Sequence, residues 1–173
     1  GPADEGAPAG SLLTQTLGAL DLWQIATVNE AGNPQDPLEV RARDLSGTTV
    51  RASKPVAVFA GVECARIPGE TPACDHLEEQ IPPVTTWGQR YVLAPTLRRG
   101  SALDYFRVLV GRDGTAIDAS LPVIPPTPSG GWRAGDVIAF ATPNPVVLEA
   151  DGPILVAQGL AGSLAGAGVG LLV

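Results

Sequence analysis

Four residues with reactive side chains lie close together in the sequence, in a stretch that holds both cysteines and the single histidine of the chain. They are Cys64, Cys74, Asp75 and His76. Thiol, carboxylate and imidazole groups at such short spacing can serve as a reactive centre, as a metal site, or as a disulfide that closes a loop. The residue types alone are compatible with all three kinds of site, so we use the spacing of the residues to choose between them.

The spacing of the two cysteines favours a disulfide. A bond between Cys64 and Cys74 closes a loop of about eleven residues, and constraint of the unfolded chain then stabilises the fold by roughly 3 kcal/mol. The enclosed run ARIPGETPA has two prolines and a glycine, which are typical of a turn with little core of its own. Paired cysteines of this kind are typical of extracellular or periplasmic proteins. The sequence therefore predicts a structural disulfide formed in an oxidising compartment.

A metal site is the weaker alternative. Zinc ligands usually pair at short sequence spacings, whereas nine residues separate the two cysteines. The adjacent residues Cys74, Asp75 and His76 cannot readily converge on one ion. We therefore expect no metal and no cofactor. For His76 the ordinary interpretation is a hydrogen bond from its ring to a neighbouring carboxylate or carbonyl.

Catalytic motifs have little support. A Ser/His/Asp mechanism would need His76 as its base, and the run AGSLAG differs from the Gly-x-Ser-x-Gly elbow by one position. Two carboxylate pairs could serve a carbohydrate-active enzyme, namely Glu78 with Glu79 and Asp113 with Asp118. Eighteen acidic residues make such pairs inevitable on a surface. We therefore expect no catalytic residues, and we keep the carboxylate-based enzyme as an alternative.

The tryptophans and the cysteine-rich stretch offer a surface for binding. Trp23 alternates with apolar residues and is expected in the core. Trp87 and Trp132 each follow a Pro-Pro turn, where they could cap the ends of a sheet or contact a partner, and capping is the favoured interpretation. The candidate partner-binding surface consists of Asp75, His76, Glu79 and Trp87.

The elements that must position these residues are predicted to be short strands. Runs rich in Val, Ile and Leu alternate with turns rich in Gly, Asn and Asp, a spacing typical of an all-β sandwich or barrel. The expected strands are 22–28, 38–45, 48–53, 55–61, 90–95, 105–111, 115–121, 136–142, 146–150 and 153–159. One short helical turn is expected at 75–80. Asp75 is placed as its N-cap, Glu78 follows as in a capping box, and Pro82-Pro83 ends it.

The chain also repeats itself. Residues 48–61 can be laid on residues 146–159 with four identical positions, and a similar strand lies upstream of each copy. One such unit alone could hardly bury a core. We therefore expect an antiparallel β-sandwich built from two related halves, at about 21–95 and 96–173. Residues 1–20 are interpreted as a protease-cleavage scar and a loose lead-in.

Composition and charge argue against several classes of partner. The chain of 173 residues is 45% hydrophobic and only 17% charged, with a net charge of −7. An acidic chain with no basic cluster beyond Arg98-Arg99 does not favour nucleic acid or an anionic membrane surface. No apolar stretch of about 18 residues occurs, so no insertion into a membrane is expected.

Part of the chain resembles a known family. The runs concerned are KPVAVFAG, CDHLEEQIPPVTTWG with the upstream Cys64, and YVLAP. They are similar to the N-terminal domain of IgGFc-binding proteins. The resemblance covers most of residues 48–160 and is weak over the first 47 residues and the last dozen. Ten arginines against one lysine are typical of a GC-rich bacterial genome, which favours a bacterial-type member.

The resemblance implies a secreted or cell-surface, non-enzymatic module within a longer chain. We therefore expect extracellular binding or adhesion to a protein or glycan partner, next to neighbouring domains of the same chain. A structural domain within a large surface assembly is the main alternative. The family offers no catalytic residues to carry over, and Fc binding belongs to its named member.

Overall fold

The computed structural model describes residues 7–8, 10–27, 44–67, 75–96, 103–160 and 171–172. The chain divides into two compact units, Gly1–Leu45 and Ser46–Val173. The described part of the first unit has no helix and no strand, so the strand expected at 22–28 is wrong over the residues described. The strand expected at 38–45 lies largely outside the described residues. The regular structure that can position a site therefore comes from the second unit.

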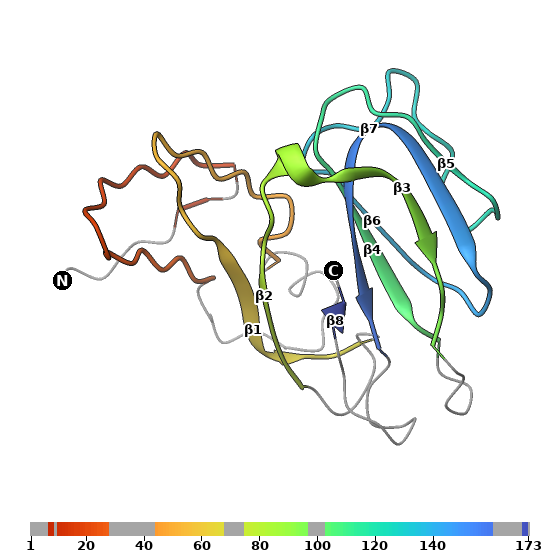
Figure 1. The fold of residues 1–173 in the computed structure, drawn as a ribbon, viewed down its shortest axis with the longest axis horizontal. Coiled ribbons are helices and arrows are strands. Elements are labelled where there is room, and N and C mark those ends of the chain that lie inside the picture. The colour runs from red at the N-terminus through yellow and green to blue at the C-terminus, as the bar shows by residue number, and fades with distance from the viewer. Residues whose placement is uncertain are drawn as a thin grey trace. The chain divides into compact units, whose positions relative to one another are not determined.

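The second unit is built from strands, which form two antiparallel sheets (Figure 1). In chain order the elements are β1 (Phe59–Ala65), β2 (Asp75–Gln80), the 3-10 turn η1 (Val84–Thr86), β3 (Gly88–Leu93), β4 (Tyr105–Val110), β5 (Ile117–Ala119), β6 (Val137–Ala141), β7 (Val146–Gly159) and β8 (Leu171–Leu172). Strands β1 and β2 form a two-stranded sheet. The larger sheet has the order β3-β7-β4-β6, and β5 and β8 also pair with β7. The expectation of an all-β, antiparallel fold is confirmed.

The longest strand, β7, organises the larger sheet. Its first half pairs with both β3 and β5, so that Leu148 lies opposite Tyr91 on one side and Ala119 on the other. Its second half pairs with β4 and β8. The turn signal in its middle lies where the β3–β7 register shifts, between the pairs Gly88–Ile154 and Arg90–Glu149. The chain continues as one strand there, and the Gly111 N–H donates to the Pro153 carbonyl at 2.8 Å. Gly152 is required at this point, since a Cβ atom there would collide with the hydroxyl oxygen of Thr115.

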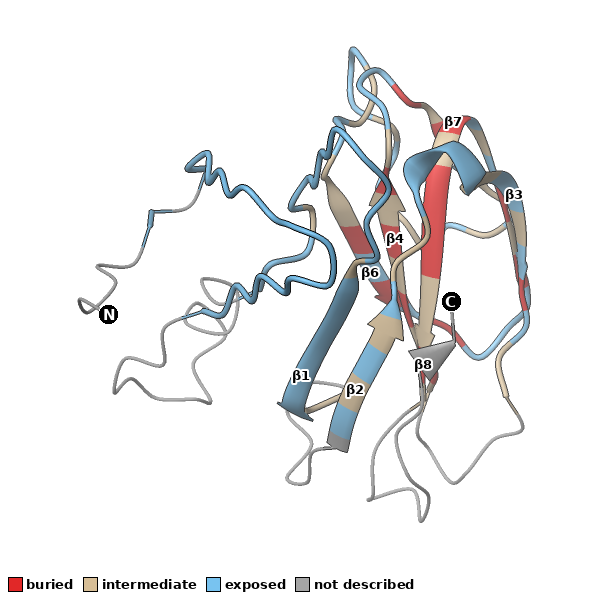
Figure 2. Cartoon of the chain, turned by 60° about the vertical axis from the view of Figure 1, so that its left-hand side comes forward, coloured by how far each residue is buried: buried red, intermediate tan, exposed pale blue. Residues whose placement is uncertain are grey.

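The core is formed by the buried side chains of the larger sheet, which alternate along its strands with more exposed ones. In β4 buried and partly exposed residues alternate, so that Phe106 is fully buried while Arg107 faces the other side. Phe106 stacks on Phe140 of β6 with ring centroids 5.5 Å apart. Figure 2 shows the buried residues concentrated in β4, β6 and β7. The core cluster consists of Leu93, Phe106, Val108, Val110, Ile117, Ile138, Phe140, Val146, Leu148, Ile154 and Val156.

The helical turn expected at 75–80 is wrong, because these residues form strand β2. They pair with β1 in a register that places Phe59 opposite Gln80. An isolated helix of one or two turns is marginal in water, whereas pairing with β1 satisfies the backbone groups on one edge of β2. The helical turn that does form is η1, at Val84–Thr86, and it follows Pro82-Pro83.

The two copies of the sequence repeat, residues 48–61 and 146–159, do not have the same secondary structure. Residues 146–159 form one continuous strand, but residues 48–58, which align with most of it, form none. Val50 and Val56 are exposed there, so β-favouring residues without a neighbouring strand do not become a strand. The division into two related halves stays a prediction. Trp23, which we expected in the core, is exposed.

Candidate functional site

Two residues of the surface expected around the cysteine-rich stretch, His76 and Glu79, lie on strand β2. On β2, His76 Nε2 lies 3.4 Å from Glu78 Oε2, and both side chains are exposed. Successive residues of a strand point to opposite faces, so Glu79 lies on the other face from His76. Asp75 begins β2, and its side chain lies outside the described part of the structure. The neighbour that we expected for His76 is therefore Glu78. His76 and Glu79 lie on opposite faces of β2, and the expected surface as a whole stays a prediction.

Trp87 is held by the fold. Its indole N–H donates a hydrogen bond to the carbonyl of Pro82, at 3.0 Å. Its ring lies against Gly111, where a Cβ atom would approach Trp87 Cε3 to 3.0 Å. The only polar atom of its side chain is thus used inside the molecule. This geometry supports capping by Trp87 more than contact with a partner.

Cys64 lies on β1, next to the irregularity in pairing between Val62 and Ala65. It is disulfide-bonded, and no cysteine of the described part of the chain is free. Cys74 lies outside the described residues, so its pairing with Cys64 stays a prediction.

A second surface brings together charged and apolar side chains from β3, β5 and β7. We call it the outer face, because the neighbouring residues on these strands point into the core. Arg90 on β3 and Asp118 on β5 both lie directly opposite Glu149 on β7. Cross-strand partners share one face of a sheet. The outer face consists of Arg90, Val92, Asp118, Ser120, Val147 and Glu149.

The outer face contains a hollow of about 330 Å³, lined by Asp118, Ala119, Ser120, Val147 and Glu149. Ser120 is fixed in place by two contacts with β7. The Val147 N–H donates to Ser120 Oγ at 3.0 Å, and the Ser120 N–H donates to the Val147 carbonyl at 2.9 Å. The Ser120 hydroxyl keeps its own proton for a further partner. The hollow therefore combines two carboxylates with one fixed hydroxyl.

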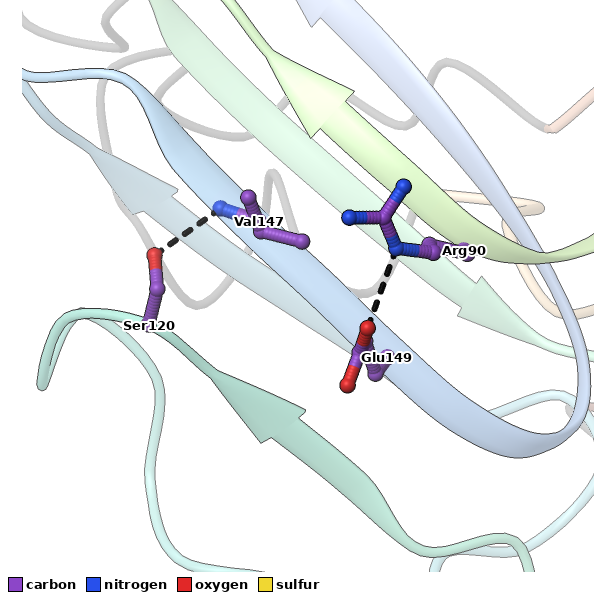
Figure 3. A network of polar contacts seen from close by, with 4 residues as sticks. All are labelled: Arg90, Ser120, Val147 and Glu149. Atoms are coloured by element: carbon purple, nitrogen blue, oxygen red, sulfur yellow. Dashed lines mark hydrogen bonds and ion pairs between the residues drawn. The ribbon is translucent and has the colours of Figure 1, made fainter.

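The charges on the outer face are not balanced. Arg90 Nε donates to Glu149 Oε1 at 3.0 Å (Figure 3), and these side chains are 64% and 65% exposed. Like charges directly opposite each other in a sheet are destabilising, and Asp118 lies opposite Glu149. The row thus holds one guanidinium and two carboxylates: Arg90 pairs with Glu149, and Asp118 lies on the other side of β7. One negative charge of the row is therefore not balanced. An exposed ion pair adds only about 0–1 kcal/mol, so fold stability does not account for this row.

The carboxylate pairs considered for catalysis are not assembled. Glu78 and Glu79 point to opposite faces of β2, as successive strand residues do. Asp113 Oδ1 accepts a hydrogen bond from the Ala134 N–H at 2.9 Å and so holds a turn. Asp118 lies in the outer face, opposite Glu149. Within the described ranges, no group of three or more His, Cys, Asp or Glu side chains is arranged to hold a metal ion.

Comparison with known proteins gives the family. The model of the family described as IgGFc binding protein matches residues 1–170. The chain belongs to the IgGFc-binding protein family. The human IgGFc-binding protein is 35% identical over 133 residues, which are 77% of this chain and 2% of the human protein. The chain thus spans a small part of the length of its curated relative. No solved structure matches it.

This IgGFc-binding family member has no membrane-crossing helix among its described residues. Its outer face was missed from the sequence, except for Asp118, which we considered only as a catalytic carboxylate. One signal was available, because Arg90 and Val92, like Val147 and Glu149, are two residues apart in runs of strand character. What was missing was the pairing of three strands that come from separate parts of the chain.

Proposed function

We propose that this family member is a non-enzymatic module that acts outside the cell, secreted or at the cell surface, and binds a protein partner through the outer face. The observation that carries the proposal is the row Arg90, Glu149 and Asp118, which carries an excess negative charge beside a hollow. The name of the human relative supports a protein as the partner, and the Fc part of immunoglobulin G is the first candidate.

The chemistry of the outer face specifies what the partner presents to it. A lysine or arginine side chain placed between Asp118 and Glu149 would balance the excess charge. Its aliphatic stem would lie on Val147, and the exposed Val92 would add apolar contact. Charged residues that are complementary across an interface raise the association rate and fix the register of the complex. A basic side chain flanked by apolar residues is therefore the expected contact.

The proposal is tested by surface plasmon resonance, with the whole chain immobilised and immunoglobulin Fc and Fab fragments as analytes. Saturable binding of Fc, and none of Fab, is expected. Asp118→Asn should weaken Fc binding at least tenfold, as expected for the loss of one close charge pair worth about 1.5 kcal/mol or more. Glu78→Gln is the matched control, because it removes the same charge from the other sheet and should leave the affinity unchanged.

Three results would count against the proposal. No saturable binding of Fc at about 100 μM, an affinity of about −5.5 kcal/mol, would exclude Fc as the partner. An equal loss of affinity in Asp118→Asn and Glu78→Gln would show a general charge effect and remove the outer face from the argument. If the chain bound a glycan on an array but did not bind Fc, and Asp118→Asn abolished the glycan binding, the partner of the outer face would be a glycan and not a protein.

A further inference from the structure

We infer that the free edge of β1 binds the same edge of a second copy of this chain, in antiparallel pairing. This joins two β1–β2 sheets into one sheet of four strands. The inference rests on the backbone and surface of β1, and it is independent of the outer face and of the proposed function.

The hydrogen-bonding pattern of β1 leaves one edge available. The Ile81 N–H donates to the Val58 carbonyl at 2.9 Å, so these two residues form a hydrogen-bonded pair of the ladder. Such pairs alternate along antiparallel strands, which directs the backbone groups of Ala60 and Val62 toward β2. The N–H and C=O of Phe59 and Gly61 then point to the opposite edge. Among the described residues, β1 pairs with no strand other than β2.

The surface of β1 carries few of the features that keep strand edges apart, and its one irregularity of pairing lies near its end, between Val62 and Ala65. Natural edge strands carry lysines, prolines or inward-pointing charges that prevent pairing with another chain. From Phe59 to Ala65 there is no proline and no basic residue, and Glu63 is the only charge. Six of the seven residues are exposed, and Figure 2 shows β1 in the colour of exposed residues. Phe59 is 61% and Val62 is 46% exposed.

The single charge of β1 is compatible with pairing between two copies. Antiparallel pairing about Gly61 places Gly61 opposite Gly61 and Glu63 of one copy opposite Phe59 of the other. The two Glu63 residues are then four strand positions apart, about 13 Å, which exceeds the Debye length of about 8 Å at physiological ionic strength. Pairing to β2 of a second copy would instead bring Glu63 near Glu78 and Glu79. Charge therefore favours β1 against β1.

The expected complex is weak. Five paired residues on each strand bury much less than the roughly 1,200 Å² of a standard protein interface. Sedimentation equilibrium of the whole chain, from about 10 μM to about 1 mM, covers the range in which such a contact is populated. The apparent mass should rise toward twice the monomer mass. A constant monomer mass up to 1 mM would overturn the inference.

Variants at Phe59 separate backbone pairing from simple apolar contact. Phe59→Pro removes an N–H that points to the free edge and makes no bond to β2, and proline is tolerated at the first residue of a strand. It should weaken the dimer at least tenfold, whereas Phe59→Ala keeps the N–H and should weaken it less. Val92→Lys changes an exposed residue of the other sheet and should have no effect. Equal losses in Phe59→Pro and Phe59→Ala would refute strand pairing.

Hydrogen exchange in the unmodified chain tests the inference without depending on whether a variant folds. The amide hydrogens of Ala60 and Val62 should be protected at every concentration, because they bond to β2. The Gly61 amide should exchange quickly at about 10 μM and at least tenfold more slowly at about 1 mM, the range in which a weak dimer forms. A Gly61 amide whose exchange does not depend on concentration would contradict the inference.

Discussion

Asp118→Asn should make the protein more stable while it weakens binding. In the structure this carboxylate lies opposite Glu149 in the β5–β7 ladder, and the one ion pair of the row is between Arg90 and Glu149. Among the described residues, no hydrogen bond to the carboxylate of Asp118 offsets the repulsion. Removing the charge therefore removes a cost and breaks no contact, which is what the proposed binding role of Asp118 predicts.

The size of the effect follows from the geometry. Two exposed like charges about 6 Å apart, in an effective dielectric constant of about 80, repel by about 0.7 kcal/mol. Screening at physiological ionic strength reduces this to about 0.3 kcal/mol. Asp118→Asn should therefore raise the free energy of unfolding by roughly 0.3–0.7 kcal/mol, with the larger value at low salt. For a unit of this size the midpoint temperature should rise by about 1–3 °C.

The assay is urea unfolding, followed by tryptophan fluorescence at neutral pH in low and in high salt. Glu78→Gln is the control, because it removes one negative charge from the other sheet. The difference in the free energy of unfolding between the two variants is then free of the effect of net charge. Arg90→Gln should act in the opposite direction and lower the free energy of unfolding by about 0.3–1 kcal/mol, because Glu149 loses its counter-charge while Asp118 still lies opposite it. At 1 M salt, where the Debye length is about 3 Å, these differences should largely disappear.

Two results would refute this reasoning. A loss of more than about 1 kcal/mol in Asp118→Asn would mean that the carboxylate makes a contact that stabilises the fold. A gain that is the same at low and high salt would mean that the effect does not come from the charge. In either case the excess charge of the outer face could no longer be assigned to a partner.

Two further predictions concern the fold that supports the outer face. Phe106→Ala should lower the free energy of unfolding by about 3–5 kcal/mol, because Phe106 is fully buried and stacks on Phe140. Urea unfolding measures it, and a loss below about 1 kcal/mol would contradict this packing. Asp104→Ala should cost about 1–3 kcal/mol, since the buried carboxylate accepts hydrogen bonds from Thr96 and Gln158. Thermal unfolding measures it, and an unchanged midpoint would show that this network does not stabilise the fold.

Strands with a clear local pattern could be predicted from the sequence. Residues 105–110 alternate between buried and partly exposed positions, and the strand expected at 105–111 differs from β4 by one residue. The strands expected at 136–142 and 90–95 agree with β6 and β3 to within two residues at each end. A short run of apolar and aromatic residues between turn signals is a local property of the sequence, so no knowledge of the neighbouring strands is needed to detect it. The alternation of burial along β4 is added by the fold.

Residues 75–80 show where local signals fail. Asp75 and Glu78 have the spacing of a capping box, and the sequence predicts a helical turn. Pairing with β1 turns the same residues into a strand, because it satisfies the backbone over a longer stretch than one turn of helix can. The partner strand ends ten residues earlier in the chain, and nothing within 75–80 indicates it.

By itself, the sequence determined the all-β class, the family, and the alternation that directs Arg90 and Glu149 outward from their strands. Only the tertiary structure placed these two side chains together, because they are 59 positions apart in the sequence. It also decided that β5 pairs on the other side of β7 and brings Asp118 opposite the same glutamate. The register between distant strands depends on how the whole core packs, so the excess charge of the outer face is a property of the folded chain.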